Sequence, residues 1–325
     1  MIILHDGYDQ DKIKGHHIVI IFGVGLIGKH LAQSLLRSFY VIAKNLTFSW
    51  GEGKDRTNEK IAIIHSIDQL VENGRHHSEA DFSCRIDFVW SAGKGGFFMR
   101  EIEARSELSS FLDVLAITDH VCASYPKYLV RFHMLSSAGG LFEGQRNVKL
   151  NSIPCVKRPY GAMKLEQEHL LTSKNTMIQF IYRPSSVYGF AGLSHRLGLI
   201  PTLLWNGLNN KLSSIFGTPD TLRDFVWAQD IGEFISNIIL SQITISNCFI
   251  LASGKPSSLF EILKRVENIL NKKIYYHFTN DGRTNVEHNT FSFETYPSGW
   301  LPLDLETGIH RMYKDIILQK SINFA

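Results

Sequence analysis

Residues 17–28, which read HIVIIFGVGLIG, decide the fold of this chain. Their first half is an almost unbroken apolar run rich in β-branched residues, which is typical of a strand buried on both faces of a sheet. The GxGxxG pattern that follows leads into residues 29–37, whose leucines share one stripe of a helix, and residues 40–43 form a second apolar strand. Strand, glycine turn, helix and strand predict a βαβ unit with a right-handed crossover in a parallel sheet.

The glycine turn predicts a site for a dinucleotide. Gly23 and Gly25 allow a tight turn and a close approach of the backbone to a ligand, and Gly28 lets the helix pack on the strand. Leu26 and Ile27 complete the turn before the helix, and in such sites the N-terminus of the helix faces a pyrophosphate. The alternative interpretation of the same residues is a tight turn between a strand and a helix, without a ligand.

Strands and helices continue to alternate through the first part of the chain. The sequence predicts a short strand and a helix within residues 45–73, then a strand at 85–90, a helix at 101–122, a strand at 127–135, a helix at 160–172 and a strand at 177–182. We therefore expect an α/β fold in which residues 1–189 form a dinucleotide-binding domain with a Rossmann-type, doubly wound parallel sheet. Residues 190–325 predict a smaller C-terminal α+β substrate lobe, packed at the carboxyl edge of the sheet.

The composition excludes several classes of protein. The chain has 325 residues and a net charge of +3, and its basic side chains are too scattered to form a nucleic-acid-binding block. The longest apolar stretch, residues 18–27, is too short to span a bilayer, and the first residues lack the pattern of a secretory signal. The four cysteines are far apart, and the pairs His16-His17 and His76-His77 lack further ligands nearby. We therefore expect a reduced, cytoplasmic enzyme without a metal.

Tyr160 and Lys164 form a YxxxK pattern within a predicted helix. Positions i and i+4 share one helix face, so the phenol and the ammonium point into the same site. The ammonium favours the phenolate, which makes Tyr160 usable as a proton shuttle near neutral pH. Ser137, 23 residues upstream at the end of a predicted strand, adds a hydroxyl that can hydrogen-bond the same substrate oxygen. The alternative is a solvated Tyr–Lys pair.

Together these residues resemble the extended short-chain dehydrogenase/reductase superfamily, in its nucleotide-sugar epimerase/dehydratase branch, over nearly the whole chain. The matching motifs are the glycine turn, SSAGG at 136–140 with the YxxxK pair, RPSSVYG at 183–189, RDFV at 223–226 followed by Asp230, and GWLP at 299–302 followed by LETGI at 305–309. They occur in the order that the family shows. Five ordered matches are specific for the superfamily.

The resemblance implies a role for each motif. Ser137 orients and polarises the sugar oxygen, with Ser136 as the second choice, while Tyr160 is the general acid/base and Lys164 holds the nicotinamide ribose. The residues implied for NADP or NAD are Gly23, Gly25, Leu26, Ile27, Gly28, Lys44, Asn45, Ala92, Gly93, Tyr160, Lys164, Pro184 and Val187. Those implied for a nucleotide-diphosphate sugar are Ser137, Ser186, Arg223 and Arg283. The two arginines suit a diphosphate, because a planar fork matches phosphate oxygens; the alternative for each is a surface ion pair.

Several positions depart from the family's pattern. Phe22 stands where the first glycine of TGxxGxxG would fall, so the geometry of the turn is expected to differ slightly. The acidic residue that binds the adenosine 2′-hydroxyl in NAD users is replaced by Lys44 and Asn45, and with Lys29 nearby this favours NADP. Residues 138–140 (AGG) replace the Asp-Glu pair of the 4,6-dehydratases, so dehydration is not expected. Ser186 replaces an Asn that is common before VYG.

The sequence therefore predicts a cytoplasmic, homodimeric oxidoreductase that uses NADP, with NAD as the alternative, on a nucleotide-diphosphate sugar. The preferred reaction is reduction of a 4-keto group, with hydride from the nicotinamide and a proton from Tyr160. A C4 epimerase with retained NAD is the close alternative, and a non-catalytic dinucleotide sensor is the alternative of another class. Neither nucleic acid nor a membrane is expected as a partner, and the resemblance places such enzymes in cell-surface polysaccharide biosynthesis.

Overall fold

The computed structural model describes residues 1–6, 16–38, 40–51, 55–75, 84–93, 95–192, 197–279 and 288–323. They form two compact units that interleave along the sequence. The first unit takes the described residues of Met1–Ser136, Arg158–Tyr182 and Ile235–Cys248, and the second takes those of Ser137–Lys157, Arg183–Phe234 and Phe249–Ala325. The boundary expected between residues 189 and 190 stays a prediction about domains.

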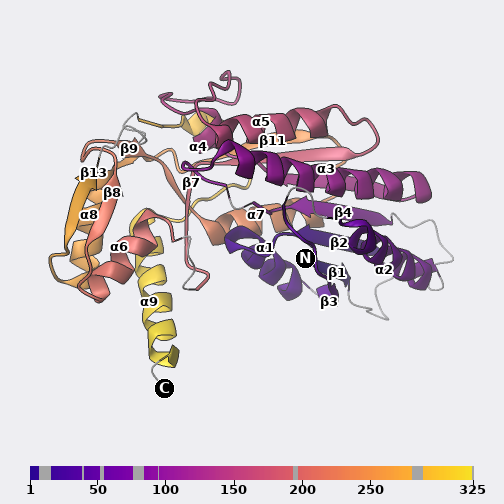
Figure 1. The fold of residues 1–325 in the computed structure, drawn as a ribbon, viewed down its shortest axis with the longest axis horizontal. Helices are drawn as coiled ribbons and strands as arrows, with labels where there is room; N and C mark the ends of the chain where they lie inside the picture. Colours follow the sequence, from indigo (N-terminus) through magenta and orange to yellow (C-terminus); the bar gives the residue numbers. More distant parts are fainter. Residues whose placement is uncertain are drawn as a thin grey trace. The chain divides into compact units, whose positions relative to one another are not determined.

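The central sheet has seven strands in the order β11-β6-β5-β4-β2-β1-β3 (Figure 1). The strands are β1 (Ile2–Asp6), β2 (His17–Phe22), β3 (Tyr40–Asn45), β4 (Arg85–Trp90), β5 (Leu129–Leu135), β6 (Ile178–Pro184) and β11 (Asn247–Leu251). β2, β4, β5 and β6 pair in parallel, so that Ile20 lies beside Phe88 and Phe88 beside Phe132. The predicted α/β fold with a Rossmann-type parallel sheet is confirmed.

The strand β1 corrects one detail of that prediction. The βαβ pattern predicts that residues 40–43 join a parallel sheet, but β3 pairs with β1, which is antiparallel to both β3 and β2. Ile2 of β1 lies between Ile21 of β2 and Asn45 of β3. The apolar residues Ile2, Ile3 and Leu4 are buried in this position, which a short β-branched strand favours.

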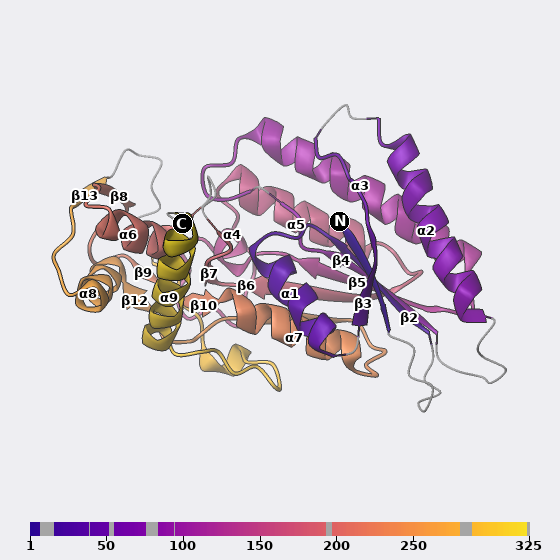
Figure 2. The same cartoon turned by 90° about the horizontal axis from the view of Figure 1, so that it is seen from below.

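Helices cover both faces of the sheet (Figure 2). α2 (Thr57–Arg75), α3 (Glu101–Ser124) and α5 (Pro159–Thr172) lie on one face, while α1 (Leu26–Arg37) and the C-terminal part of α7 (Ala228–Leu240) lie on the other. On the first face, Ile63 of α2 and Phe111 of α3 join Phe88 and Phe132 in one apolar core. Helices on both faces are what a doubly wound sheet requires, because its strands are buried on both sides.

The segment before α2 differs from the prediction. The sequence predicts a short strand and a helix within residues 45–73, but beyond Asn45 the described part contains only the helix α2. Phe48 and Trp50 instead pack edge-to-face between Phe22 and Trp90, with successive ring centroids 5.2, 4.8 and 5.7 Å apart. The Phe48 side chain therefore joins the core without the hydrogen-bond ladder of a strand, while Trp50 stays 38% exposed at its edge.

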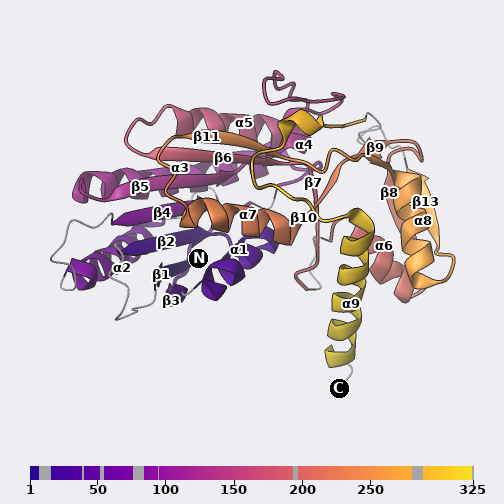
Figure 3. The same cartoon turned by 180° about the vertical axis from the view of Figure 1, so that it is seen from behind.

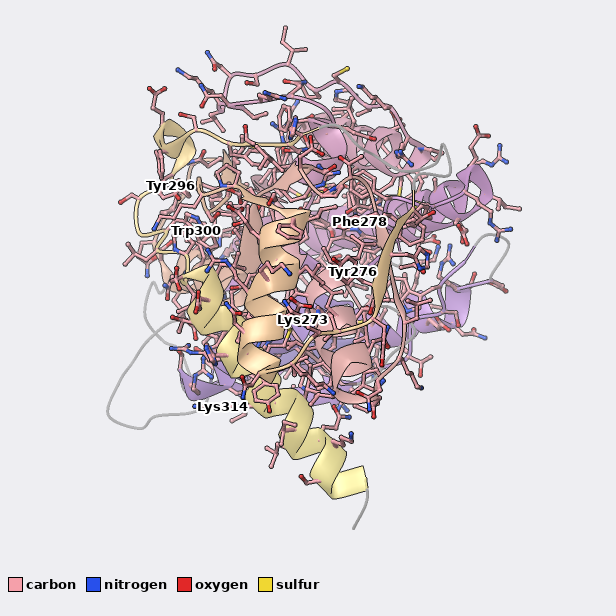
Figure 4. All side chains as sticks on the ribbon, turned by 90° about the vertical axis from the view of Figure 1, so that its left-hand side faces the viewer. Lys273, Tyr276, Phe278, Tyr296, Trp300 and Lys314 are labelled. Carbon is pink, nitrogen blue, oxygen red and sulfur yellow. The ribbon has the colours of Figure 1, made fainter. Side chains whose placement is uncertain are left out.

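The second unit combines short strand pairs with helices around its own core (Figure 3). The pairs are β7 (Ser186–Tyr188) with β10 (Phe225–Trp227), β9 (Leu222–Arg223) with β12 (Ser257–Ser258), and β8 (Ser213–Phe216) with β13 (Tyr276–Thr279). Its helices are α4 (Ala138–Leu141), α6 (Leu199–Leu208), α8 (Leu259–Leu270) and α9 (Leu305–Asn323), with a short turn η1 (Phe293–Thr295). On β13, the rings of Tyr276 and Phe278 pack edge-to-face (Figure 4).

Candidate active site

The glycine turn between β2 and α1 allows no side chain at two of its three glycines. Gly23 has φ +92°, and a Cβ placed on it would lie 2.4 Å from the Cα of Ala92. A Cβ on Gly28 would lie 2.1 Å from the carbonyl oxygen of Gly23. Both positions therefore need glycine for the backbone to close, as the sequence predicts.

Gly25 differs, because a Cβ on it would meet no described atom within 4 Å. It is the N-cap of α1, where no side chain hydrogen-bonds the first turn and where that turn carries no acidic residue. The backbone N–H groups that start at Leu26 and Ile27 thus keep their capacity for an anion, and the helix dipole adds to it. The turn fits the pyrophosphate of a dinucleotide.

The end of β4 closes against this turn. The Ser91 hydroxyl donates to the carbonyl oxygen of Gly23 over 2.6 Å, and Ala92 packs on the Gly23 backbone. Gly93 follows with φ +137°, and a Cβ on it would lie 2.6 Å from Oε1 of Glu107 on α3. The residues expected at a cofactor on β2, α1 and β4 are therefore brought together.

The helix α5 delivers Tyr160 and Lys164 to the same region. It begins with Pro159 in the first turn, where the missing N–H of proline costs nothing. The Tyr160 ring packs over Gly95, since a Cβ on that glycine would lie 2.7 Å from the ring. Lys164 is 4% exposed, and its ammonium donates to Glu107 Oε1 and Gln167 Oε1, each over 3.0 Å. The alternative of a solvated Tyr–Lys pair is wrong for Lys164.

Glu107 is the residue of this site that the sequence interpretation missed. It lies on the buried stripe of α3 together with Ala104, Phe111 and Val114. A lone acidic residue on an otherwise apolar stripe was the available signal, because a carboxylate is buried only beside a partner. Its partner, Lys164, lies on another helix, which the pattern of α3 by itself does not reveal.

The two serines after β5 have different hydrogen bonds. The Ser136 hydroxyl donates to the Glu168 carboxylate on α5. The Ser137 hydroxyl is the N-cap of α4 and accepts from the backbone N–H of Gly140 over 3.1 Å. A serine hydroxyl has one hydrogen to donate, so Ser136 has used it whereas Ser137 keeps it. This favours Ser137 over Ser136 as a donor to a ligand oxygen.

Other predicted residues lie elsewhere. Lys44 and Asn45 are exposed at the end of β3, with β1 between that strand and the glycine turn. Ser137, Pro184, Ser186, Val187 and Arg223 belong to the second unit. Arg223 on β9 is partly exposed and donates to the carbonyl oxygen of Leu222. The predicted site residue Arg283 lies outside the described residues.

Two acidic residues of the family-like motifs hold the second unit together. Asp224 accepts from the Ser185 hydroxyl over 2.6 Å and from the Ser253 backbone and hydroxyl, and burial raises the pKa of Asp224. Asp230 accepts from the backbone N–H of Leu303, and burial raises the pKa of Asp230 to about 6. Trp300 of GWLP donates to the Ala252 carbonyl oxygen over 2.8 Å (Figure 4). These motif residues tie distant segments to one another.

No group of three or more His, Cys, Asp or Glu side chains among the described residues is arranged to hold a metal ion. None of the described helices combines the length and the apolar character needed to cross a membrane.

Comparisons with known proteins identify a matching family and similar proteins. A family model described as the NAD dependent epimerase/dehydratase family matches residues 18–244. The dTDP-D-glucose 4,6-dehydratase of Dictyostelium discoideum is 25% identical over 296 residues, which cover 80% of this chain and 64% of that protein. The chain thus matches less than two thirds of the length of this relative.

Two solved structures of UDP-glucose 4-epimerases share the fold. The enzyme of Thermotoga maritima, solved with UDP-glucose, has a TM-score of 0.71 at 17% identity, with 93% of this chain and 99% of that chain covered. The enzyme of Thermus thermophilus, in complex with NAD, has a TM-score of 0.67 at 18% identity, with 91% and 97% covered. The family model covers more than half of the chain, and the chain therefore belongs to the NAD dependent epimerase/dehydratase family, whose members are enzymes of the extended short-chain dehydrogenase/reductase type.

Proposed function

We propose that this chain is a nucleotide-sugar C4 epimerase that retains its nicotinamide dinucleotide. The observation that carries the proposal is the position of Tyr160 and Lys164 on one face of α5, beside the glycine turn. The Tyr160 ring packs on Gly95, and Lys164 binds Glu107, which packs on Gly93. A bound nicotinamide would accept the hydride from C4 of the sugar and return it to the opposite face.

The chain's own residues move the proton. Tyr160 takes the proton of the C4 hydroxyl when the hydride leaves, and returns it when the hydride comes back. The buried ammonium of Lys164 lies on the same helix face, one turn after Tyr160. Ser137 donates a hydrogen bond to the same oxygen, and Arg223 and Arg283 bind the diphosphate.

The residues of α4 argue against the reaction of the dehydratase relative. Elimination of water needs a group that takes a proton from the neighbouring carbon and one that protonates the leaving hydroxyl. Ala138, Gly139 and Gly140 stand in the segment where the dehydratases of this family carry an Asp-Glu pair, and none of the three has a titratable side chain. This favours a reaction that stops at the transfer of hydride and proton.

The position of β1 bears on the cofactor. In sheets of this type an acidic residue about 20 residues after the glycines binds the adenosine ribose, at the end of the next strand. Here β1 separates β3 from β2, so Lys44 stands about 5 Å farther from the glycine turn than on an adjacent strand. That distance weakens the argument for a 2′-phosphate at Lys44 and supports NAD, the cofactor in the family's description.

A 4-keto-sugar reductase that uses NADPH is the second candidate. The exposed Lys29 follows the last glycine of the turn, and Lys44 is exposed at the end of β3. Two cations, with no acidic residue at these positions, favour a cofactor with an additional phosphate. The reductase would use Tyr160, Lys164 and Ser137 in the same roles, but it would release an oxidised cofactor after each turnover.

The two candidates differ in their need for added cofactor. We expect the purified protein to interconvert UDP-glucose and UDP-galactose with no nicotinamide added, because the hydride returns to the sugar. A protein that is inactive until NADPH is supplied, and then consumes one NADPH for each 4-keto sugar, would be the reductase. Binding of a dinucleotide without turnover of either kind of sugar would identify a sensor.

Replacement of Tyr160 by Phe tests the proton shuttle. We expect turnover to fall by roughly 10²–10⁴-fold, since the variant loses its general acid/base. Dinucleotide binding should persist, because the glycine turn and Lys164 are unchanged. Tyr275→Phe is the matched control, since Tyr275 is 65% exposed, and it should leave turnover as in the wild type. Near-normal turnover in Tyr160→Phe would contradict the mechanism.

The proposal also includes the remaining expectations. A homodimer in the cytoplasm that contributes to cell-surface polysaccharide biosynthesis fits an enzyme acting on activated sugars. Size measurement in solution tests the first of these expectations.

A further inference from the structure

Glu107 has a hydrogen-bonding capacity that its ion pair does not use. The Glu107 side chain is 8% exposed, and its carboxylate links α3 to Lys164 on α5. Oε1 accepts from the Lys164 ammonium over 3.0 Å. Among the described residues, none donates a hydrogen bond to Oε2. A carboxylate oxygen accepts hydrogen bonds through its lone pairs, so Oε2 has the capacity to accept one from a ligand.

Lys164 has one complementary group left. Its ammonium carries three N–H donors, and the contacts with Glu107 and Gln167 use two of them. One N–H therefore remains for a ligand. The pair presents a free acceptor, on Glu107, next to a free donor, on Lys164.

The place of this pair is set by Gly93. A Cβ on Gly93 would lie 2.6 Å from Oε1 and 3.0 Å from Oε2 of Glu107, so the carboxylate rests directly on the backbone at the end of β4. The preceding residue, Ala92, contacts the glycine turn at Gly23. Glu107 and Lys164 therefore lie between the glycine turn and Tyr160. Tyr160 lies on α5 one helical turn before Lys164.

We propose that Glu107 binds the cofactor directly, as the acceptor for one hydroxyl of the nicotinamide ribose, while Lys164 donates to the other. A vicinal diol suits this pair, because one hydroxyl donates its hydrogen to the carboxylate and its neighbour accepts from the ammonium. The inference rests on the proposed function, since it takes the dinucleotide as the ligand. It adds a carboxylate to the residues that the sequence predicts for the cofactor.

A purely structural pair is the alternative. A buried lysine needs a counter-charge, and Glu107 supplies one whether or not a cofactor binds. In that case removal of the carboxylate would disturb α3 and α5, and through them every ligand of this region to a similar degree. The two explanations therefore differ in whether the effect depends on the ribose.

The test compares two ligands on the variant Glu107→Gln, which keeps the shape of the side chain but loses its charge. NADH carries the nicotinamide ribose, whereas ADP carries only the adenosine and the diphosphate that the glycine turn would hold. We expect NADH to bind about tenfold more weakly or worse, as for a lost hydrogen bond to a charged group, and ADP to bind as to the wild type. Calorimetric titration measures both affinities after removal of any co-purified nucleotide.

Glu103→Gln provides the matched control. Glu103 lies on the same helix, its side chain is 48% exposed, and its partner is Arg100 rather than Lys164. The same change of charge there should leave both affinities at the wild-type values. A loss for Glu103→Gln equal to that for Glu107→Gln would mean a general effect of charge and would overturn the proposal.

The remaining outcomes separate the inference from the proposed function. Equal weakening of NADH and ADP in Glu107→Gln, or no weakening at all, overturns the role of Glu107. Should that variant not fold, the wild type is titrated with an NADH analogue that lacks the hydroxyls of the nicotinamide ribose; equal affinity for the analogue and for NADH again overturns it. A wild-type protein that binds neither NADH nor NADPH would overturn the proposed function itself.

Discussion

The two faces of the central sheet differ in whether they bury charged side chains. On the face under α2, α3 and α5, the strands contribute residues such as Ile20, Phe88 and Phe132 to a continuous apolar core. On the face that meets the end of α7, the alternate residues of the same strands include Asp87 and Arg131, and both are 0% exposed. One sheet therefore shows how a chain buries apolar surface and how it buries charge.

The polar face is an ordered chain of hydrogen bonds. Asp87 of β4 accepts from His17 of β2 through Oδ2 and from His133 of β5 through Oδ1, the latter over 2.6 Å. The other ring nitrogens contact Tyr40 and Tyr182, respectively. Because a carboxylate only accepts hydrogen bonds, the Nε2 of each histidine carries the hydrogen that is donated to Asp87.

Arg131 joins this chain to α7. Its guanidinium donates to both oxygens of Asp87, over 2.7 and 3.0 Å, and to the carbonyl oxygens of Ile239, in the last turn of α7, and Ser241, just after it. A cation is favourable at the C-terminus of a helix. Burial opposes the charge on Asp87, but the hydrogen bonds that His17 and His133 donate to it hold the pKa of Asp87 well below its usual value. Arg131 thus satisfies carbonyl oxygens at the C-terminal end of α7.

Among these variants, Asp87→Asn should destabilise the protein most strongly. It leaves the buried Arg131 without its counter-charge, so the free energy of unfolding should fall by about 3–5 kcal/mol. Glu306→Gln is the control, because Glu306 pairs with Arg265 at the surface, with exposed fractions of 55% and 36%, and should cost about 0–1 kcal/mol. Urea unfolding measures both. Similar losses would show that burial of the Asp87 pair adds nothing.

Ile20→Ala should break the apolar face. The residue is fully buried, and the loss of its side chain leaves a cavity worth about 2–5 kcal/mol of unfolding free energy. The loss should be the same at neutral and at mildly acidic pH, since no charge is involved. Ile61→Ala on α2, where Ile61 is 59% exposed, should change stability by less than about 0.5 kcal/mol. A pH-dependent loss for Ile20→Ala would mean that the two faces are coupled.

Tyr182→Phe should remove one end of the polar chain. Burial raises the pKa of Tyr182 well above its ordinary value, so its hydroxyl stays protonated and donates to Nδ1 of His133 over 2.8 Å. The variant leaves that nitrogen unsatisfied and should lose about 1–3 kcal/mol in urea unfolding. Tyr275→Phe at the surface should lose nearly nothing. Wild-type stability in Tyr182→Phe would show that this end of the chain is dispensable.

The pH dependence of the unfolding free energy should also distinguish the two faces of the sheet, and this is the smallest of the expected effects. Burial lowers the pKa of His133 from its ordinary 6.5, so below that pH the unfolded chain binds a proton that the folded protein does not. The unfolding free energy should therefore fall as the pH drops below 6.5, by at most about 1.4 kcal/mol per unit from this residue. His133→Gln should show a shallower dependence than the wild type. Identical slopes would contradict a neutral, buried His133.

The sequence predicts well what depends on neighbouring residues. The glycine turn, the buried strands and the YxxxK helix all follow from local patterns, because β-branched runs, glycine conformations and helical spacing act over a few residues. The polar face left a signal of the same kind, since Arg85, Asp87, Arg131 and His133 alternate with apolar residues in two neighbouring strands. That alternation predicts a shared face once the strand order is known.

The remainder depends on contacts between distant segments. Glu107 and Lys164 meet across two helices, and β1 inserts between strands that the βαβ pattern would leave adjacent. No pattern within residues 1–6 specifies which strands β1 joins. His17, which the sequence offers only as half of an isolated histidine pair, gains its role from Asp87, 70 residues away. Such positions are chosen by the free energy of burial of the whole sheet.

The antiparallel β1 also sets an order of assembly. It meets both partners through Ile2, which pairs with Ile21 and with Asn45, so three strands and α1 come together within 45 residues. Short loops close at a low entropic cost and form early. The pairing of Ile20 with Phe88 has to wait for a longer segment. β3 pairs with β1 alone in the described sheet. We therefore expect this edge to behave as one cooperative unit that folds before the rest of the sheet and unfolds after it.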